Sequence, residues 1–262
     1  MIPPPGQTGV VALVTDFGMQ DDYVGQMHAA ILSVNPELRI IDLCHFVPAG
    51  NVRPGAFLLY HDLGILPEGS AVGAVVDPGV GSRRALLAAE IENRYLVAPD
   101  NGLIAPLLDR DHHARVYRLE NREWVRSQPS STFHGRDIIG PAAAMLASGH
   151  NVEDAGPPVQ HWASIAIHPV EQEDGFAGEV MWVDRFGNLI TNLTADQAEG
   201  LTLWIDGRPI RRVSTFVDAD SEEIVYLIGS RNTVEIVRNG DSAAEALGLG
   251  LGAVVRLVRE PV

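Results

Sequence analysis

The sequence predicts an α/β N-terminal domain with a mainly parallel sheet, followed by a smaller all-β, barrel-like C-terminal domain. Residues 10–147 alternate short apolar runs with helix-like segments, the pattern of a parallel sheet covered by helices. Residues 171–175 are polar and acidic, as in a linker. Residues 178–258 hold short β-prone runs separated by turns, which is typical of a small barrel or sandwich. We therefore expect domains at 1–168 and 175–262.

The chain begins with a predicted strand, helix and strand. Residues 10–14 are apolar and are followed by Thr-Asp-Phe-Gly. Over residues 24–34, apolar side chains recur at spacings of three and four, which predicts one face of a helix. Asp21 or Asp22 can cap this helix. Residues 39–43 form the second predicted strand.

The loop at 75–84 is the feature around which the first domain is organised. An apolar run over 71–76 ends at Asp77, and Pro-Gly-Val-Gly-Ser then leads to Arg83 and Arg84. Proline cannot continue a strand ladder, and glycine permits a close approach of the backbone. Ligands of open α/β sheets bind outside the carboxyl ends of the strands. The loop is therefore either a structural turn with a surface ion pair or part of a ligand site.

The remaining segments complete both domains. In the first domain we expect a helix over 54–63, a hairpin of 85–91 with 94–98, a short helix ending near 108, a strand over 114–119, and a polar loop over 130–137 that opens a helix over 138–147. In the second we expect strands over 178–183, 189–193, 201–205, 210–216, 224–228, 234–237 and 254–258, with a short helix over 242–247.

Composition restricts the partners of the protein. The formal net charge is -15 and no basic cluster is present, which argues against a nucleic-acid partner. No apolar run approaches the ~20 residues of a membrane span, and residues 1–9 lack the features of a signal peptide. One cysteine, Cys44, excludes an internal disulfide and fits a reducing cytosol. We expect a cytoplasmic protein without a nucleic-acid partner and without a membrane span.

Three polar features of the first domain can converge on a ligand, namely Asp16, the loop at 77–84 and His134. The second domain adds a polar bend at 184–188 and a polar turn at 229–232, followed by Glu235 and Arg238. An aromatic ring beside Asn and Asp suits a planar, hydrogen-bonding ligand such as a nucleobase, although the bend alone is equally a simple turn. The spacings contain no metal-ligand motif, no phosphate-binding glycine loop and no serine-hydrolase elbow.

Five motifs occur in an order that resembles a known family. They are Thr15-Asp16-Phe17-Gly18, the stretch from Val76 to Arg84, Pro99-Asp100-Asn101-Gly102, Ser131-Thr132-Phe133-His134-Gly135-Arg136-Asp137 and Phe186-Gly187-Asn188. Together they resemble the S-adenosyl-L-methionine hydrolases (adenosine-forming), also called SAM hydroxide adenosyltransferases, which are related to fluorinases and chlorinases. The resemblance implies an α/β domain, a β domain, and a homotrimer with sites between neighbouring subunits.

The resemblance also implies site residues. The catalytic set is Asp77, Arg84 and His134, which halide-using relatives lack, so water is the expected nucleophile. Asp16 matches the position that contacts the ribose hydroxyls. The predicted substrate-binding set is Asp16, Asp21, Asp184, Phe186, Asn188, Ser230, Arg231, Glu235 and Arg238. In one segment the chain differs from the family. Many relatives carry bulkier residues where this chain has Ala49-Gly50-Asn51, and these positions correspond to the ribose-side wall of the pocket.

The implied reaction is attack of water at C5′ of the ribose, which gives adenosine and L-methionine. A sulfonium leaves as a neutral thioether, so we expect no metal and no cofactor. Two alternatives stay open at this point. The first alternative to the hydrolase is a non-catalytic adenosine- or nucleoside-binding protein. The second is a halide-dependent SAM adenosyltransferase that forms an adenosyl halide.

Overall fold

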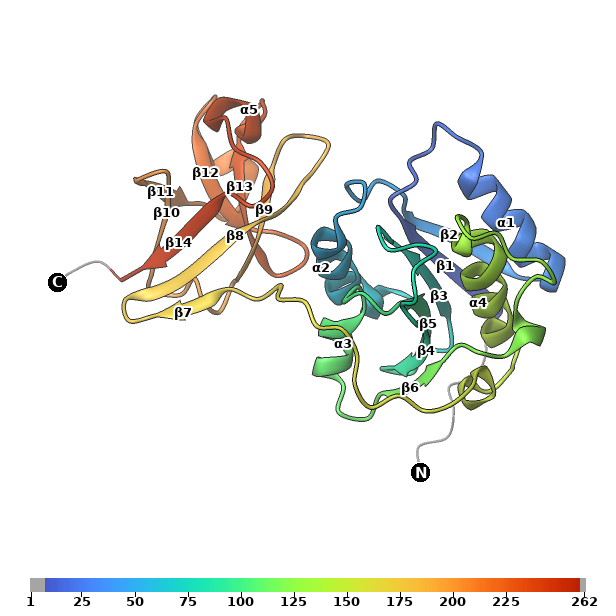
Figure 1. The fold of residues 1–262 in the computed structure, drawn as a ribbon. Coiled ribbons are helices and arrows are strands. Elements are labelled where there is room, and N and C mark those ends of the chain that lie inside the picture. Colours follow the sequence, from blue (N-terminus) through green and yellow to red (C-terminus); the bar gives the residue numbers. More distant parts are fainter. Residues whose placement is uncertain (1–7, 260–262) are drawn as a thin grey trace. The chain divides into compact units, whose positions relative to one another are not determined.

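The structure, a computed structural model, describes residues 8–259 and contains two compact units that divide between Ala166 and Ile167 (Figure 1). Each unit has its own hydrophobic core. The absence of a signal peptide was predicted from residues 1–9. Residues 1–7 of this segment lie outside the described residues. No helix of the described residues is long and apolar enough to cross a membrane.

The N-terminal unit is built on a six-stranded sheet with the strand order β2-β1-β3-β5-β4-β6. The strands are β1 (Val10–Thr15), β2 (Arg39–Cys44), β3 (Ala71–Val75), β4 (Leu86–Ile91), β5 (Arg94–Pro99) and β6 (Arg115–Arg118). β1 pairs in parallel with β2 and β3, and β3 pairs in parallel with β5. β4 is antiparallel to both β5 and β6. The α/β class is as predicted, but the sheet is mixed, because the hairpin turns the chain back after β3.

Helices cover both faces of this sheet, with α2 and α3 on one face and α1 and α4 on the other (Figure 1). The α-helices are α1 (Tyr23–Val34), α2 (Val52–Asp62), α3 (Ala105–Arg110) and α4 (Gly140–Ala147). Short helical turns are η1 (Leu63–Ile65), η2 (Arg122–Trp124), the π-helix η3 (Gly135–Ile139) and η4 (Val152–Ala155). The apolar face predicted for the first helix is the buried one, with Met27 and Ile31 fully inside the core.

Parallel pairing of the three strands β2, β1 and β3 places their carboxyl ends along one edge of the sheet. The segments that follow these ends carry the polar residues predicted to form a site. They are residues 16–18 after β1, 45–50 after β2 and 76–84 after β3. β1 and β3 are buried along their whole length, so the ends are held firmly by the core.

The C-terminal unit is a closed β-barrel. Its strands are β7 (Val170–Gln172), β8 (Gly175–Val183), β9 (Leu189–Thr194), β10 (Thr202–Ile205), β11 (Arg208–Arg212), β12 (Ile224–Ile228), β13 (Thr233–Arg238) and β14 (Val254–Val258), with the short helix α5 (Ala243–Leu247). The order is β14-β10-β11-β12-β13-β9-β8-β7, and pairing of β14 with β8 closes seven strands into a ring. Alternating side chains such as Val180, Leu203 and Leu257 fill its interior.

Three expectations about elements were wrong. The acidic segment after Pro169 is no linker, because β7 and β8 pair across it as an antiparallel hairpin. The strand expected over 210–216 ends at Arg212, because Thr215 and Asp218 form a capping box that begins the 3-10 turn η5 (Phe216–Asp218). Asp22 occupies the N-cap position of α1 without a capping bond, and its carboxylate accepts instead from the Gln26 side chain.

Candidate active site

Asp77 and Arg84 form a two-contact ion pair within the loop that follows β3. Arg84 Nε donates to Asp77 Oδ1 at 2.6 Å, and Arg84 Nη2 donates to Asp77 Oδ2. Gly79 N–H also donates to Asp77 Oδ1, at 3.2 Å. Only 3% of the Asp77 side chain and 9% of the Arg84 side chain are exposed, so this is not the surface ion pair of a simple turn. Bidentate pairing with a carboxylate fixes orientation as well as position.

His134 joins this pair from the loop that precedes η3. Arg84 Nη2 lies 3.1 Å from His134 Nδ1. A guanidinium can only donate, so Nδ1 must accept, and the ring is neutral with its proton on Nε2. Burial, and then the nearby Arg84 charge, lower the pKa of His134, which favours the same neutral form. The three predicted catalytic residues are therefore in contact, with Arg84 in the middle.

A close contact between backbones holds the two loops together. Gly81 has φ +80°, a conformation that side chains rarely adopt, and a Cβ there would lie 2.8 Å from the carbonyl oxygen of Ser131. A glycine is therefore needed at this position. It lets the loop of Asp77 and Arg84 lie against the loop of His134.

Asp16 follows β1 on the same edge of the sheet. Its Oδ2 accepts from Gly50 N–H at 2.8 Å. Burial is the main cause that raises the pKa of Asp16, and the charge of Asp77 adds to it, while backbone donors including Gly50 partly offset the rise. Ala49-Gly50-Asn51, where this chain departs from many relatives, thus supplies a backbone donor to a predicted site residue.

One cavity of about 260 Å³ unites these features. Its lining comprises Asp16, Phe17, Gly50, Val75, Asp77, Pro78, Val80, Thr132, Phe133, His134 and Gly135. Carboxylates of two strand ends and an imidazole thus line the same cavity. Phe17 and Phe133 form part of its wall and pack edge to face, with ring centroids 5.6 Å apart. The structure therefore brings together the predicted residues of the first domain, except Asp21, which is exposed and does not line the cavity.

Residues behind the cavity anchor its walls. Asn101 Nδ2 donates to the carbonyl oxygen of Val76, at 2.8 Å, just before Asp77. Asp137 is fully buried and accepts from Ser130 N–H and from two nitrogens of Arg136. The contact of Asn101 carries a weak sequence signal, because its partner is a backbone atom 25 residues away. Asn101 was seen only as part of a turn motif.

The candidates of the β-barrel unit separate into two groups. Phe186, Asn188 and Arg238 line a groove of about 610 Å³ together with Phe216, Gly240, Asp241, Ser242 and Glu245. Phe186 is 76% exposed there, which leaves its ring open to a ligand. Arg238 is already paired with Asp241 at 2.7 Å. Sequence reasoning missed Phe216, because that residue was assigned to a strand.

The second group surrounds Glu235. Burial is the main cause that raises the pKa of Glu235, the charge of Asp184 adds to it, and Arg231 opposes it. Asp184 also organises the predicted bend, since its carboxylate accepts from Phe186 N–H, Asn188 N–H and the Asn188 amide. Ser230 is exposed and does not line the groove. The bend is thus a well-bonded turn that presents an aromatic ring.

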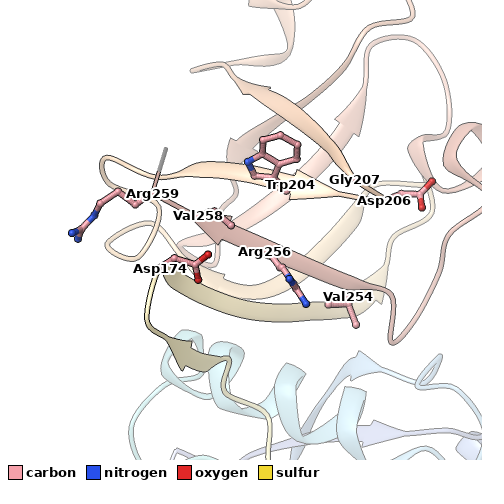
Figure 2. Close-up of a pocket in the computed structure, with 8 residues that line it drawn as sticks. All are labelled: Asp174, Trp204, Asp206, Gly207, Val254, Arg256, Val258 and Arg259. Carbon is pink, nitrogen blue, oxygen red and sulfur yellow. The ribbon is translucent and has the colours of Figure 1, made fainter. Parts of the chain in front are cut away.

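Another hollow of the barrel unit, of about 440 Å³, contains none of the predicted residues (Figure 2). It is lined by Asp174, Trp204, Asp206, Gly207, Val254, Arg256, Val258 and Arg259. Figure 2 shows Arg259 and Asp206 at opposite ends of it, with Asp174 and Arg256 between them. Among residues 8–259, no three His, Cys, Asp or Glu side chains gather in a way that could hold a metal ion.

The fold and site define a two-unit protein in which an α/β unit, with a carboxylate, a guanidinium and an imidazole in contact in its loops, precedes a closed barrel. Family models of the SAM hydroxide adenosyltransferase N-terminal and C-terminal domains match residues 11–156 and 178–256. The chain therefore belongs to the SAM hydroxide adenosyltransferase family, which confirms the resemblance seen in the motifs.

Known relatives agree with this assignment over almost the whole chain. The (R)-S-adenosyl-L-methionine hydrolase of Salinispora tropica is 37% identical, over 94% of this chain and 97% of the relative. A fluorinase of Actinopolyspora mzabensis is 26% identical, over 95% and 97%. The crystal structure of an uncharacterized conserved protein from Thermotoga maritima superposes with a TM-score of 0.88 at 31% identity, covering 95% of this chain and 100% of that chain.

Proposed function

We propose that this protein hydrolyses S-adenosyl-L-methionine to adenosine and L-methionine. The observation that carries the proposal is the contact of Asp77, Arg84 and His134 at one cavity, in a chain similar to curated (R)-S-adenosyl-L-methionine hydrolases. The reaction forms a bond between the oxygen of water and C5′ of the ribose. The C5′–S bond breaks, its electron pair stays on sulfur, and the proton released from water goes to the site.

Asp77 is the proposed proton acceptor. A carboxylate has about four acceptor positions, and three are used by Arg84 Nε, Arg84 Nη2 and Gly79 N–H. The remaining position is on Oδ2, where one hydrogen of a water molecule can bind. As that water attacks, positive charge develops on its oxygen, and the carboxylate stabilises the charge or removes the proton.

His134 and Arg84 have the proposed role of holding this geometry. Arg84 fixes both the carboxylate and the imidazole ring. The Nε2–H of the neutral ring then remains as a donor that can orient the oxygen of water. Positioning a nucleophile in line with its target is worth up to ~7–11 kcal/mol of the barrier. A sulfonium is already an activated leaving group, which is why we propose a reaction without a metal or cofactor.

Substrate binding is proposed to use both units. Asp16 would accept from the ribose hydroxyls. Asp184, Phe186, Asn188, Ser230, Arg231, Glu235 and Arg238 would contact adenine and the methionine tail, and Asp21 would make a further contact with the substrate. We further propose a cytoplasmic homotrimer in which barrel units complete the sites of neighbouring chains. Light scattering would then give three times the 28.3 kDa chain mass, whereas a single chain mass would exclude the trimer.

The direct test incubates the protein with S-adenosyl-L-methionine and follows adenosine and methionine by chromatography. The matched variant is Asp77→Ala, which removes the proposed proton acceptor but leaves Asp16 and the walls of the cavity. We expect turnover to fall about 100- to 10,000-fold, the usual contribution of a general base, while adenosine still binds. Unchanged turnover in this variant would remove Asp77 from the mechanism.

A halide-dependent reaction is the second candidate, because a fluorinase is among the relatives. The same incubation with added fluoride or chloride distinguishes the two reactions. Formation of an adenosyl halide would favour the second candidate. Binding of adenosine without turnover under any condition would favour the non-catalytic nucleoside-binding protein.

A further inference from the structure

The ring of His45 lies at a buried junction behind the cavity. Only 3% of His45 is exposed, and Thr15, the last residue of β1, is fully buried. Thr15 Oγ1 is 2.8 Å from His45 Nδ1, and His45 Nε2 is 2.9 Å from Asp42 Oδ1. His28 of α1 bonds the same Asp42 oxygen, at 2.7 Å. The ring therefore connects the ends of β1 and β2, and Asp42 connects it to α1.

The directions of these bonds follow from the donors that are available. Thr15 Oγ1 accepts from the N–H of Phe17, at 3.2 Å. The Asp42 carboxylate accepts from His45 Nε2–H. In a neutral His45 ring, Nδ1 is then an acceptor and receives the hydroxyl proton of Thr15. The hydroxyl thus bridges the buried ring and the backbone of the turn that carries Asp16.

Further contacts join the same two segments side by side. Gly18 N–H donates to the carbonyl oxygen of His45 at 2.7 Å, and Val47 N–H donates to that of Thr15 at 3.3 Å. The third contact is the bond from Gly50 N–H to the Asp16 carboxylate. The Thr15 hydroxyl and the His45 ring thus lie beside the contacts that keep the Asp16 side chain near its backbone donor.

We propose that Thr15 and His45 are positioning residues, whose hydrogen bond fixes the Asp16–Phe17 turn against the segment of Gly50. This inference rests on the proposed function only for the role of Asp16 as the residue that holds the ribose. Neither Thr15 nor His45 lines the cavity, so their effect on substrate reaches it through Asp16. The expected consequence is weaker binding of the ribose, seen in KM more than in kcat.

The first test compares Thr15→Val with Thr15→Ser. Valine keeps the shape of threonine but lacks the hydroxyl, whereas serine keeps the hydroxyl and lacks the methyl group. We expect Thr15→Val to raise the KM for S-adenosyl-L-methionine and the Kd for adenosine about tenfold, the factor of roughly one hydrogen bond. Thr15→Ser should stay close to the unmodified protein in both. Equal constants for the two variants would overturn the inference.

The second test uses His45, in case the valine variant does not fold. Asparagine has an oxygen near the position of Nδ1 and can accept from Thr15, but it does not reach Asp42. Glutamine extends toward Asp42 but leaves Thr15 without its acceptor. Binding of adenosine should therefore be retained in His45→Asn and weakened in His45→Gln. A purely structural role predicts that binding follows thermal stability in both, and that result would overturn the inference.

The two proposals fail in different ways. If the unmodified protein releases no adenosine, the proposed function fails, and crystal structures of the Thr15 variants then decide the positioning role. The inference predicts that the Asp16 carboxylate leaves Gly50 N–H in Thr15→Val and keeps it in Thr15→Ser. An unchanged Asp16 in Thr15→Val would refute the positioning role whatever the reaction.

Discussion

Arg84 is the residue on which the arrangement of the site depends. It donates to Asp77 and to His134 at once, and the carboxylate and imidazole make no direct bond to each other among the described contacts. Lysine could not replace it, because an ammonium cannot make the paired contact and the imidazole contact in one plane. Arg84 therefore sets both the orientation of the carboxylate and the tautomer of the ring.

The titration of His134 predicts how kcat depends on pH on the acid side. Burial and Arg84 lower the pKa of His134, so the ring stays neutral somewhat below the ordinary value of about 6.5. Protonation removes the acceptor for Arg84 and places two cations side by side. We expect kcat to fall with acidification below about pH 6.5. In His134→Asn this acid limb should disappear, and an identical limb in that variant would assign it to another group.

Asp16 should lower the stability of the unliganded protein. Its pKa is raised in the folded chain, mainly by burial, so the ionised form is less favourable there than in the unfolded chain. That cost is absent below about pH 4, the ordinary carboxyl value, and develops as the pH rises through the folded pKa. Asp16→Asn should therefore raise Tm at neutral pH, with no difference near pH 3, while weakening adenosine binding.

The exposed Asp21 provides the matched control for that measurement. Asp21→Asn should leave Tm unchanged at both pH values. A lower Tm for Asp16→Asn at neutral pH would mean that the bond from Gly50 outweighs the cost of burial.

Side chains of the site were predictable from the sequence, and their supports were not. Asp77, Arg84 and His134 stand in motifs of unusual composition, and Asp16 follows an apolar run. The donor to Asp16 is the backbone N–H of Gly50, a group that every residue except proline carries. The role of the His45 ring has no signal in the sequence, because Thr15, the partner of its Nδ1, lies 30 residues away on another element.

At the scale of elements, the buried Asp137 clamps the loop that carries His134. Its carboxylate lies at the start of η3 and accepts from Ser130 N–H, at 2.8 Å, and from the guanidinium of Arg136. Arg136 also stacks over the ring of Phe133, 4.9 Å from its centroid. The loop is therefore ordered by its own polar groups as well as by the apolar core beneath it.

Removal of this clamp should loosen the loop. In Asp137→Ala, Ser130 N–H and Arg136 lose their acceptor, so the free energy of unfolding should fall by about 1–3 kcal/mol. Arg136 lowers the pKa of Asp137, so the stabilisation exists above the ordinary carboxyl pKa and is lost as the pH falls through the folded value. Denaturant titrations at pH 7 and pH 3 check this. Equal losses at both pH values would contradict it, and the exposed Asp109→Ala is the control.

The sequence predicted the boundaries of elements correctly where buried apolar side chains define those elements. The apolar periodicity over 24–34 gave the correct buried face of α1, and the hairpin of β4 and β5 was as predicted. The parallel character was overestimated, because alternation of strands and helices was extended past a hairpin that reverses direction. The hairpin of β7 and β8 was missed, because its polar residues are exposed and carry no apolar pattern.

At the scale of the molecule, the proposed reaction assigns a role to each unit. The cavity of the α/β unit contains the polar groups for chemistry. The barrel unit offers an exposed aromatic ring beside a buried amide, with Phe186 and Asn188 in one groove. Closure of the barrel by β8 and β14 could not be derived from the sequence, because pairing of distant strands leaves no local pattern.

The central claim is that water attacks C5′, and an isotope measurement tests it most directly. The reaction is run in water enriched in oxygen-18, and both products are analysed by mass spectrometry. The account predicts one labelled oxygen in adenosine, at the 5′-hydroxyl, and none in methionine. Unlabelled adenosine, or label in methionine alone, would show that the oxygen of water does not reach C5′ and would contradict the account.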